Sequence, residues 1–489
     1  MTDSTLIHAT NVIGGNVTQP NPNAPVLDVI NPANASVIGK VYLSDTNSLN
    51  EAVSAAQNAF ESWSKTTIKN RVQVFYKYKT LLEDNIEELT DLIIREHGKI
   101  YSEAKAEIEK AIEIVEFACS LPQIVPGEVL EVSRGVECKS YREPLGVVAS
   151  IVPFNFPSMV PHWTIPIAIA LGNSFILIPS EQVPLSAMRI AELLKEAGLP
   201  DGVFNIVQGD KTIVEAICDH PDIQAVSFVG STHIAAVVYE RASANLKRVL
   251  ALGGAKNHLI LLPDAHPDMA ASNIIASMSG CSGQRCMAAS ALMAVGDVDH
   301  IIEKMVEEAK KIIPGDNLGP VISAAAKERI ENYITEAEKA GATIILDGRN
   351  PNVDGNKDGF YVGPTLIDNV TPDMAIAKEE VFGPVMSITR VKDISHAIEI
   401  ENSSEYGNGA GIFTQSGKIA NEVSKQLQSG MIGINIGVPV PREPFSFGGM
   451  NGSKFGAGDI TGKSSIEFWT RIRKITSKWN PEAAVNWMS

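Results

Sequence analysis

The chain has 489 residues and a formal charge of −16, with 44% hydrophobic and 20% charged residues. This composition is typical of a folded globular protein and excludes disorder as the dominant state. The net negative charge also argues against a basic surface that binds the phosphates of a nucleic acid. At roughly 150 residues per domain, the length favours about three structural units.

The N-terminal region carries no targeting pattern, because no lysine or arginine precedes Lys40. A secretory signal or a mitochondrial presequence would need basic residues there, so a cytoplasmic location is expected. The most apolar stretch, residues 159–179, contains His162, Asn173 and several prolines, which favours a buried helix followed by a buried strand over a membrane span. The five cysteines form no CxxC pair, which favours reduced thiols and no metal site.

The first third of the chain is predicted to be mostly helical over residues 48–118, where apolar residues recur with a 3.6-residue period. Residues 127–146 then form two polar-alternating runs around Ser133, Arg134 and Gly135, which predicts a hairpin. An isolated hairpin is marginal. We therefore expect it to pair with the C-terminal tail, residues 471–479, or with another chain.

Between residues 147 and 252, short β-branched runs alternate with helical patterns, which predicts a doubly wound parallel sheet. The near-continuous apolarity of these strands predicts helices on both faces. Strands are expected at residues 147–152, 174–178, 203–207, 225–229 and 248–252. Helices are expected at residues 158–170, 184–197, 211–219 and 232–243.

A second α/β unit is predicted after residue 256. Strands are expected at residues 257–263, 291–297, 342–348, 386–391, 409–415 and 430–435. Helices are expected near residues 298–313, 323–340 and 417–428.

Candidate ligand-binding residues follow the strands of the first unit, since a doubly wound sheet binds ligands beyond the carboxyl ends of its strands. Asn155 follows the first strand and Glu181 the second, and Gly230 with Ser231 opens a helix whose amides suit a pyrophosphate. Glu181 could accept hydrogen bonds from a ribose and repel a 2′-phosphate, which favours NAD over NADP. On spacing alone, simple helix capping explains Ser231 equally well.

Cys286, in SGQRCMAAS, is the candidate nucleophile. A free thiol is only about 3% thiolate at pH 7, and a neighbouring cation such as Arg285 raises that fraction. Cys281, four residues earlier, could share a helical face and compete for the role. For either cysteine, the plainer alternative is a small buried apolar residue.

Six motifs occur in order along the chain: PFNFP (153–157), PSE (179–181), FVGST (228–232), GQRC (283–286), EEVFGP (379–384) and PFSFGG (444–449). Together they resemble the NAD-dependent aldehyde dehydrogenase superfamily, over about residues 27–479. GAKNH (254–258), CDHPDI (218–223) and ITSKW (475–479) are similar to its CoA-acylating methylmalonate-semialdehyde dehydrogenases.

The resemblance implies a role for each matching residue. Cys286 would attack the aldehyde, the Asn155 amide and the Cys286 N–H would hold the oxyanion, and hydride transfer to NAD would leave a thioester. Glu380 would bind the nicotinamide ribose. The remaining cofactor contacts would come from Phe154, Ile178, Glu181, Gly230, Ser231, Leu252 and Phe382.

Three departures from the family pattern qualify these roles. Hydrolytic relatives carry a water-activating Glu in an ELGGK segment, but this chain has Ala251 or Leu252 there, so CoA is expected as the acyl acceptor. The relatives hold the substrate carboxylate with two arginines. Arg285 matches one and Lys110 stands at the other, keeping the charge without the bidentate fork. Ile178 replaces a lysine that contacts the adenosine ribose.

The expected activity is NAD-dependent, CoA-acylating oxidation of methylmalonate or malonate semialdehyde, with decarboxylation, to propionyl-CoA or acetyl-CoA. The open alternatives are acylating or hydrolytic oxidation of another short aldehyde, and a non-catalytic binding protein on the same fold.

The resemblance also implies a domain organisation. It places an NAD-binding domain at residues 1–126 and 147–252, a catalytic domain at 253–440 and a return segment at 441–470. An oligomerisation arm at residues 127–146 and 471–489 would build a homotetramer, with a dimer as the alternative.

Overall fold

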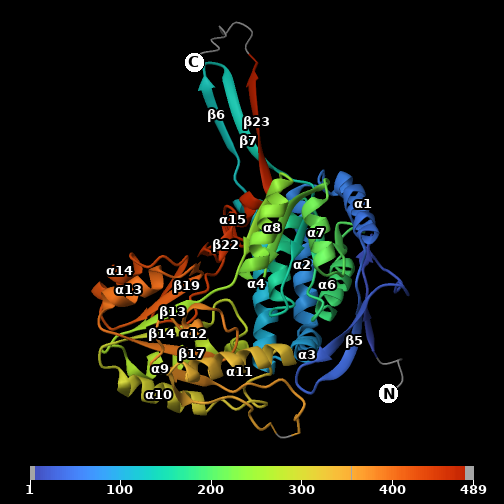
Figure 1. Cartoon of the computed structure of the whole chain (residues 1–489). Coiled ribbons are helices and arrows are strands. Elements are labelled where there is room, and N and C mark those ends of the chain that lie inside the picture. The colour runs from blue at the N-terminus through green and yellow to red at the C-terminus, as the bar shows by residue number, and fades with distance from the viewer. Residues whose placement is uncertain (1–5, 354, 480–489) are drawn as a thin grey trace.

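The computed structural model describes residues 6–353 and 355–479. Two α/β lobes lie side by side, and a narrow β arm projects beyond them (Figure 1). In the described part of the chain, no helix is both long and apolar enough to cross a membrane.

An eight-stranded sheet forms the centre of the first lobe. Its inner strands are parallel, and the chain runs from β8 through β9 to β10 before it crosses back to place β11 on the other side of β8. The strand order therefore reverses between β8 and β11, where a doubly wound sheet opens its ligand crevice. In spatial order the strands are β22 (Lys454–Phe455), β12 (Arg248–Leu252), β11 (Ile223–Val229), β8 (Val147–Ile151), β9 (Ser174–Ile178), β10 (Phe204–Ile206), β2 (Val12–Ile13) and β3 (Asn16–Val17).

Helices cover both faces of this sheet, as its apolar strands predict: every residue of β8 and β9 is buried. One apolar core joins the sheet to α1, α7 and α8, and a second joins its other face to α2 through α6. The helices are α1 (Thr46–Trp63), α2 (Ile68–Asp84), α3 (Ile86–His97), α4 (Tyr101–Ile124), α5 (Met159–Ala170), α6 (Leu185–Glu196), α7 (Lys211–Asp219) and α8 (Thr232–Ala244).

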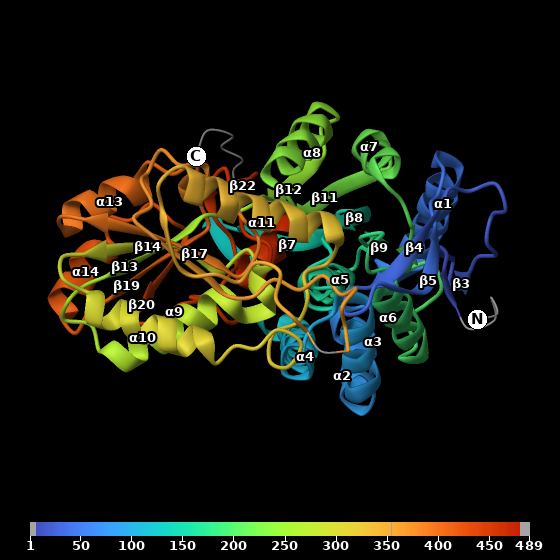
Figure 2. The same cartoon turned by 60° about the horizontal axis from the view of Figure 1, so that its bottom comes forward.

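A seven-stranded sheet forms the second lobe. In spatial order it contains β15 (Thr343–Leu346), β16 (Thr365–Asp368), β17 (Val385–Val391), β14 (Ala289–Val295), β13 (Asn257–Leu261), β19 (Gly409–Phe413) and β20 (Met431–Ile434). Its helices are α9 (Pro267–Ser279), α10 (Asp299–Lys310), α11 (Ala324–Lys339), α12 (Ala375–Lys378), α13 (Ile394–Asn402) and α14 (Gly417–Ser424). Turned about the horizontal axis, the molecule shows α11 crossing the front of this lobe (Figure 2).

The expected strands and helices of both lobes are present, with ends shifted by a few residues. The sequence analysis missed α9, α13, β16 and the short N-terminal strands. β2 and β3 have two residues each, too few to show a period, and α9 is rich in alanine and serine, so its apolar face is poorly defined. The remaining N-terminal strands are β1 (Ile7–Ala9), β4 (Val26–Asn31) and β5 (Ser36–Tyr42), which form a three-stranded sheet.

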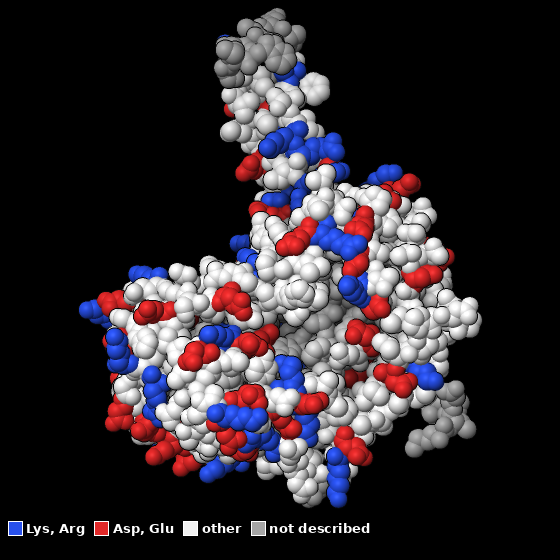
Figure 3. Space-filling model, in the orientation of Figure 1, with Lys and Arg blue, Asp and Glu red and all other residues white. Residues whose placement is uncertain are grey.

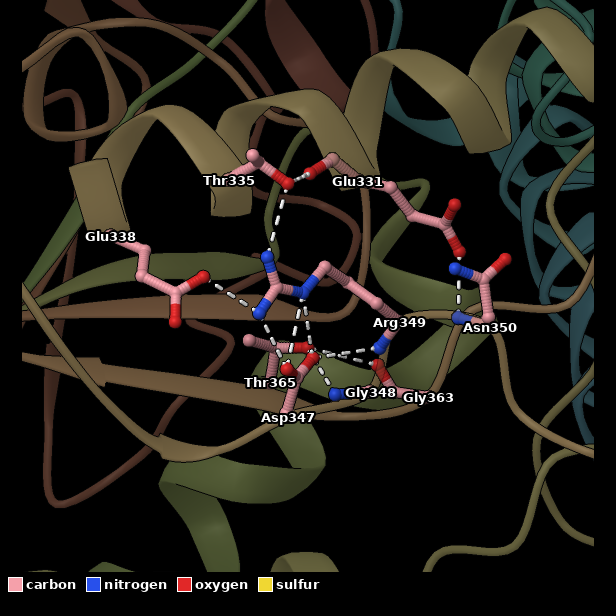
Figure 4. A network of polar contacts seen from close by, with 9 residues as sticks. All are labelled: Glu331, Thr335, Glu338, Asp347, Gly348, Arg349, Asn350, Gly363 and Thr365. Carbon is pink, nitrogen blue, oxygen red and sulfur yellow. Dashed lines mark hydrogen bonds and ion pairs between the residues drawn. The ribbon is translucent and has the colours of Figure 1, made fainter.

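Arg349, in the loop after β15, fastens α11 to its sheet (Figure 4). Its guanidinium pairs with Asp347 at 2.6 Å and with Glu338 at 2.8 Å, and it donates to Thr335 Oγ1 at 3.0 Å. Glu338 and Thr335 both belong to α11. The network therefore holds α11, which also carries Arg329, a residue that lines the cavity described below.

The arm is a three-stranded antiparallel sheet of β6 (Glu128–Ser133), β7 (Val136–Pro144) and β23 (Thr470–Lys478). β23 pairs with β7 from Thr470–Pro144 to Lys478–Val136, so the predicted hairpin does pair with the C-terminal tail. Residues 480–489, the rest of the expected arm, lie outside the described residues. β6 and β23 are the two edges of this sheet, and Val129, Leu130 and Val132 of β6 are exposed.

Asn173 fastens the arm to the first lobe. Its Oδ1 accepts hydrogen bonds from the N–H groups of Leu145 and Gly146, at 2.7 and 3.2 Å. Its Nδ2 donates to the carbonyls of Ala168 and Trp469, both at 3.0 Å. The side chain is fully buried, so a single amide satisfies backbone groups at both points where the arm leaves the lobe.

We expect Asn173→Ala to lower the free energy of unfolding by about 3 kcal/mol, because it leaves buried backbone groups without partners. Chemical denaturation followed by circular dichroism measures the loss. The matched control is Asn421→Ala, at an exposed position on α14, which should change stability by less than about 0.5 kcal/mol. Equal stability of the two variants would contradict the anchoring role.

Candidate active site

A cavity of about 710 Å³ lies between the two lobes. The space-filling view shows the molecule hollowed at this place (Figure 3). Residues after β8, β11 and β12 form one wall, at the carboxyl ends of the first sheet, and include Asn155, Gly230 and Gly254. Residues just before β14 and β17 form the other, and include Cys286 and Glu380. The cavity thus joins the carboxyl edge of one sheet to the amino edge of the other.

Cys286 lines this cavity, and its backbone is held by two asparagines. The Cys286 carbonyl accepts a hydrogen bond from Asn257 Nδ2 at 2.7 Å and another from Asn408 Nδ2 at 2.9 Å. Asn257 begins β13 and Asn408 directly precedes β19, so two strands of the second sheet set the position of the thiol. Asn257 lies within GAKNH, but nothing near Cys286 in sequence pointed to Asn408.

The surroundings of Cys286 favour the protonated thiol. Burial, and next the negative charge of Glu380, raise its pKa to about 12. The nearby Arg285 acts in the opposite direction but is outweighed. The expected direction of the Arg285 effect is therefore confirmed, but it does not decide the net shift, because burial is the larger effect.

Arg285 also lines the cavity, with part of its guanidinium turned towards the end of α9. Its Nη2 donates to the carbonyls of Ala276 and Ser277, at 2.6 and 3.0 Å. A cation is favourable there because the last carbonyls of a helix lack backbone partners. Arg285 therefore caps a helix and faces the cavity at once.

Cys281 does not share a helical face with Cys286, contrary to the alternative considered above. Helix α9 ends at Ser279, and Cys281 and Ser282 have positive φ angles of 52° and 54°. Cys281 is buried outside the cavity lining, and its N–H donates to Glu103 Oε1 at 2.7 Å. Of these two thiols, only Cys286 reaches the cavity.

Asn155 brings its amide to the loop that carries Cys286. Its Nδ2 donates to the carbonyl of Gln284 at 3.0 Å, two residues before the thiol. The structure thus brings together the residues predicted as nucleophile and oxyanion donor, which are 131 positions apart in the sequence, since 286 − 155 = 131.

A buried ion pair clamps the Asn155 loop and was missed by the sequence analysis. Lys99 and Glu107 pair with both side chains fully buried. Lys99 Nζ donates to the Asn155 carbonyl at 2.7 Å and lies 3.9 Å from the centre of the Phe156 ring. Glu107 accepts from the N–H groups of Ser158 and Met159, at 2.8 and 3.0 Å. The pair therefore fixes the loop at Asn155 and just after it.

Glu380, Phe382 and Phe154 meet at the cavity. Glu380 accepts from the N–H of Ala255 at 3.1 Å, and burial raises its pKa to about 7. Phe382 has a positive φ of 52°, an unfavourable conformation for a bulky residue, and its ring packs edge-to-face on Phe154 at 5.9 Å. Arg329, on α11, lines the cavity beside them.

Glycine is required where the thiol loop meets the Phe382 loop. Gly283 has a φ of +70°, and a Cβ there would lie 2.1 Å from the Gly383 carbonyl oxygen. Two segments predicted as separate motifs, GQRC and EEVFGP, therefore touch through their backbones.

Gly230 and Ser231 lie at the N-terminus of α8, facing the cavity. The Gly230 N–H donates to the Leu252 carbonyl at 3.1 Å, and Leu252 itself is buried behind the wall. Ser231 is the N-cap residue, yet its side chain makes no capping hydrogen bond. The helix end therefore keeps first-turn amides free of a side-chain cap, as an anion site requires.

Ile178 and Glu181 do not line this cavity. Ile178 is only 2% exposed and belongs to the core beneath α1, α7 and α8, so its side chain contributes packing rather than a hydrogen-bond donor. Glu181 lies half-buried between β9 and α6. Its contact with a ribose stays a prediction.

The segment that corresponds to ELGGK of the hydrolytic relatives has no carboxylate at the position of the water-activating glutamate. Ala251 and Leu252 are both buried, and only Gly253 and Gly254 of this segment reach the cavity. Among the described residues, the acids that line the cavity are Glu380 and Glu443.

Lys110 lines the cavity, as its expected role in substrate binding requires, but it is already paired. Its Nζ lies 2.8 Å from Glu443 Oε2 and 3.0 Å from Glu113 Oε2. Glu443, 333 residues away in sequence, had not been singled out as part of this wall.

We expect alkylation of Cys286 by iodoacetamide to accelerate about tenfold per pH unit between pH 7 and 9, because a raised pKa keeps the thiol protonated throughout. Mass spectrometry of the peptide that contains Cys286 measures the rate, with the solvent-accessible thiol of glutathione as reference. A plateau below pH 8 would show that the thiolate is stabilised instead.

Comparison with known proteins agrees with this geometry. The model of the aldehyde dehydrogenase family matches residues 19–475. The malonate-semialdehyde dehydrogenase of Halalkalibacterium halodurans is 46% identical over 459 residues, which cover 92% of this chain and 94% of the relative. Malonate-semialdehyde dehydrogenase 1 of Geobacillus thermodenitrificans is 45% identical over 478 residues, 96% of this chain and 98% of the relative.

Two solved structures have the same fold. The methylmalonate-semialdehyde dehydrogenase of Oceanimonas doudoroffii superimposes with a TM-score of 0.95 at 44% identity, covering 98% of this chain and 99% of that one. A Sinorhizobium meliloti protein in complex with NAD gives 0.95 at 41% identity, with the same coverage. The chain belongs to the aldehyde dehydrogenase family.

Proposed function

We propose that the protein oxidises malonate or methylmalonate semialdehyde with NAD and transfers the acyl group to CoA. The observation that carries this proposal is the cavity itself, where a thiol and a side-chain amide converge and no carboxylate occupies the position of the water-activating base. Relatives named for these semialdehydes match the chain over nearly its full length.

Cys286 would attack the aldehyde carbonyl and form a thiohemiacetal. Its proton must leave first, and Glu380, which lines the same cavity, would take it once bound ligands lower the pKa of the thiol from about 12. The Asn155 amide and the Cys286 N–H would donate to the oxyanion, an interaction whose loss typically costs about 2.7–4 kcal/mol of barrier. When bound, NAD supplies the hydride acceptor, and Cys286 is left as a thioester.

The residues at the carboxyl ends of β11 and β12 fit a dinucleotide. The α8 terminus after Gly230 would offer amides to a pyrophosphate, and Glu380 and Phe382, which line the same cavity, would contact the nicotinamide ribose and ring. Glu181 would accept from the adenosine ribose. Phe154 would pack near the cofactor, and Leu252 and Ile178 would support its site from the core.

CoA is the proposed acyl acceptor because Ala251 or Leu252 stands where the hydrolytic relatives carry the water-activating glutamate. A thiol ionises far more readily than water and needs less help from the protein. Arg285 and Lys110 would hold the substrate carboxylate, which decarboxylation then removes before or during acyl transfer.

The arm is proposed to join subunits. β6 leaves one edge of the arm unpaired, and its exposed Val129, Leu130 and Val132 would be buried by another chain. A homotetramer is the proposed assembly, with a dimer as the alternative. On the same view, residues 1–126 and 147–252 bind NAD, residues 253–440 carry the thiol, and residues 441–470 return to the first sheet.

We expect steady-state NADH formation from malonate semialdehyde to require CoA and to vanish in Cys286→Ala. Absorbance at the NADH band with and without CoA, and mass identification of the acyl-CoA formed, provide the measurement. Acetyl-CoA with release of carbon dioxide supports the proposal. Equal rates without CoA would contradict it and favour a hydrolytic dehydrogenase.

The Lys99 clamp predicts a second kinetic effect. We expect Lys99→Met to lower kcat at least about tenfold with little change in KM, because the Asn155 amide loses its fixed position but the substrate contacts remain. If Lys99 acts through Asn155, adding Lys99→Met to Asn155→Ala should cost little more. Additive losses in this double-mutant cycle would mean that Lys99 acts independently of Asn155.

A further inference from the structure

One wall of the cavity contains charges that neutralise one another. Lys110 pairs with Glu443 at 2.8 Å and with Glu113 at 3.0 Å, and Arg442 lies 3.5 Å from Glu113. Lys110 and Glu443 are mostly buried, with 19% and 11% of their side chains exposed, whereas the Arg442 side chain is 80% exposed. Two cations and two carboxylates give this cluster no net charge.

Glu443 depends on Lys110 in this state. A carboxylate with so little exposure loses most of its hydration, so it needs a counter-charge, and Lys110 is the ion-pair partner that the structure provides. A lysine ammonium has three N–H donors, and two of them are directed at carboxylates of the chain itself. An incoming anion therefore meets a cation that is already neutralised.

The surrounding wall offers an anion little else. Beside the cluster the cavity is lined by apolar side chains, including Phe156, Met159, Val160, Trp163, Val438 and Phe447. Arg285 and Arg329 also line the cavity; Arg285 Nη2 is occupied by two helix carbonyls, and Arg329 lies exposed beside Glu380. A carboxylate brought into such surroundings depends on the cations that it can reach, and among these Lys110 is the one already engaged by two carboxylates.

We propose that Glu443 is a specificity-determining residue. Its carboxylate forms an ion pair with Lys110 in the cavity, and the carboxylate of an anionic aldehyde must displace Glu443 before it can bind Lys110. Glu443 thereby weakens the binding of carboxylate-bearing aldehydes relative to neutral short aldehydes of similar size. The inference rests on the proposed function, since it concerns the aldehyde that Cys286 would oxidise.

Glu443→Gln tests the inference, because it removes the charge and keeps the size and hydrogen-bonding reach of the side chain. We expect the KM for malonate semialdehyde to fall about tenfold, as expected when one opposing charge is removed from a partly buried pair. The KM for propanal, which has the same chain length but no carboxylate, should stay within about twofold. A similar change for both aldehydes, or a higher KM for malonate semialdehyde, would overturn the proposal.

A double-mutant cycle shows whether Glu443 acts through Lys110. In a Lys110→Met background, Glu443→Gln should no longer improve the KM for malonate semialdehyde selectively. Retention of the full selective effect would overturn the displacement model. Glu109→Gln is the matched control, because it removes a carboxylate next to Lys110 on the exposed side of α4, outside the cavity lining, and it should shift both KM values by less than about twofold.

A binding measurement separates failure of this inference from failure of the proposed function. Calorimetric titration with 3-hydroxypropanoate, an anion of the same length as malonate semialdehyde, requires no turnover. Tighter binding to Glu443→Gln than to the unmodified protein supports the inference even if the CoA-dependent assay shows a different reaction. Unchanged or weaker binding would refute it even if acetyl-CoA is formed.

Discussion

The site depends on one polar face of a buried helix. Glu103, Glu107 and Lys110 recur at i, i+4 and i+7 on α4, so they lie on one side of the helix. Glu103 holds the loop before the thiol through the N–H of Cys281, Glu107 holds the loop after Asn155, and Lys110 holds Glu443. Three segments that are far apart in sequence are thus positioned against a single rigid element.

Placing charges inside a lobe is costly, and this cost explains how the groups are arranged. A buried ion pair gains stability only if further hydrogen bonds satisfy its remaining donors and acceptors. Lys99 and Glu107 meet this condition through the Asn155 carbonyl and two backbone amides. At the thiol the compensation from the Cys286 N–H, Arg285 and Asn408 is outweighed, so burial and Glu380 raise the pKa of Cys286. The scaffold is therefore rigid where it positions groups, and the thiol can ionise only when its surroundings change.

Local sequence patterns predicted most of the strands and helices of the two lobes. Continuous apolar runs predicted β8, β9 and β11 close to their observed bounds, and strand-end residues led to Asn155 and Gly230. The patterns failed where elements were very short, as in β2 and β3, or where tertiary burial decided helix formation, as in α9. They also placed Cys281 and Cys286 on one helical face, because nothing local showed that left-handed residues follow Ser279.

The sequence alone determined the family resemblance from short contiguous motifs and the doubly wound sheet from the alternation of strands and helices. From the same motifs it predicted the thiol, the amide and the missing base. Only the tertiary structure decided which partners those residues have. The pairing of Lys110 with Glu443 and the two asparagine contacts to Cys286 span long stretches of chain, up to 333 residues. The protonation state of Cys286 was likewise decided by burial, which depends on how the two lobes close over the cavity and not on the residues beside it.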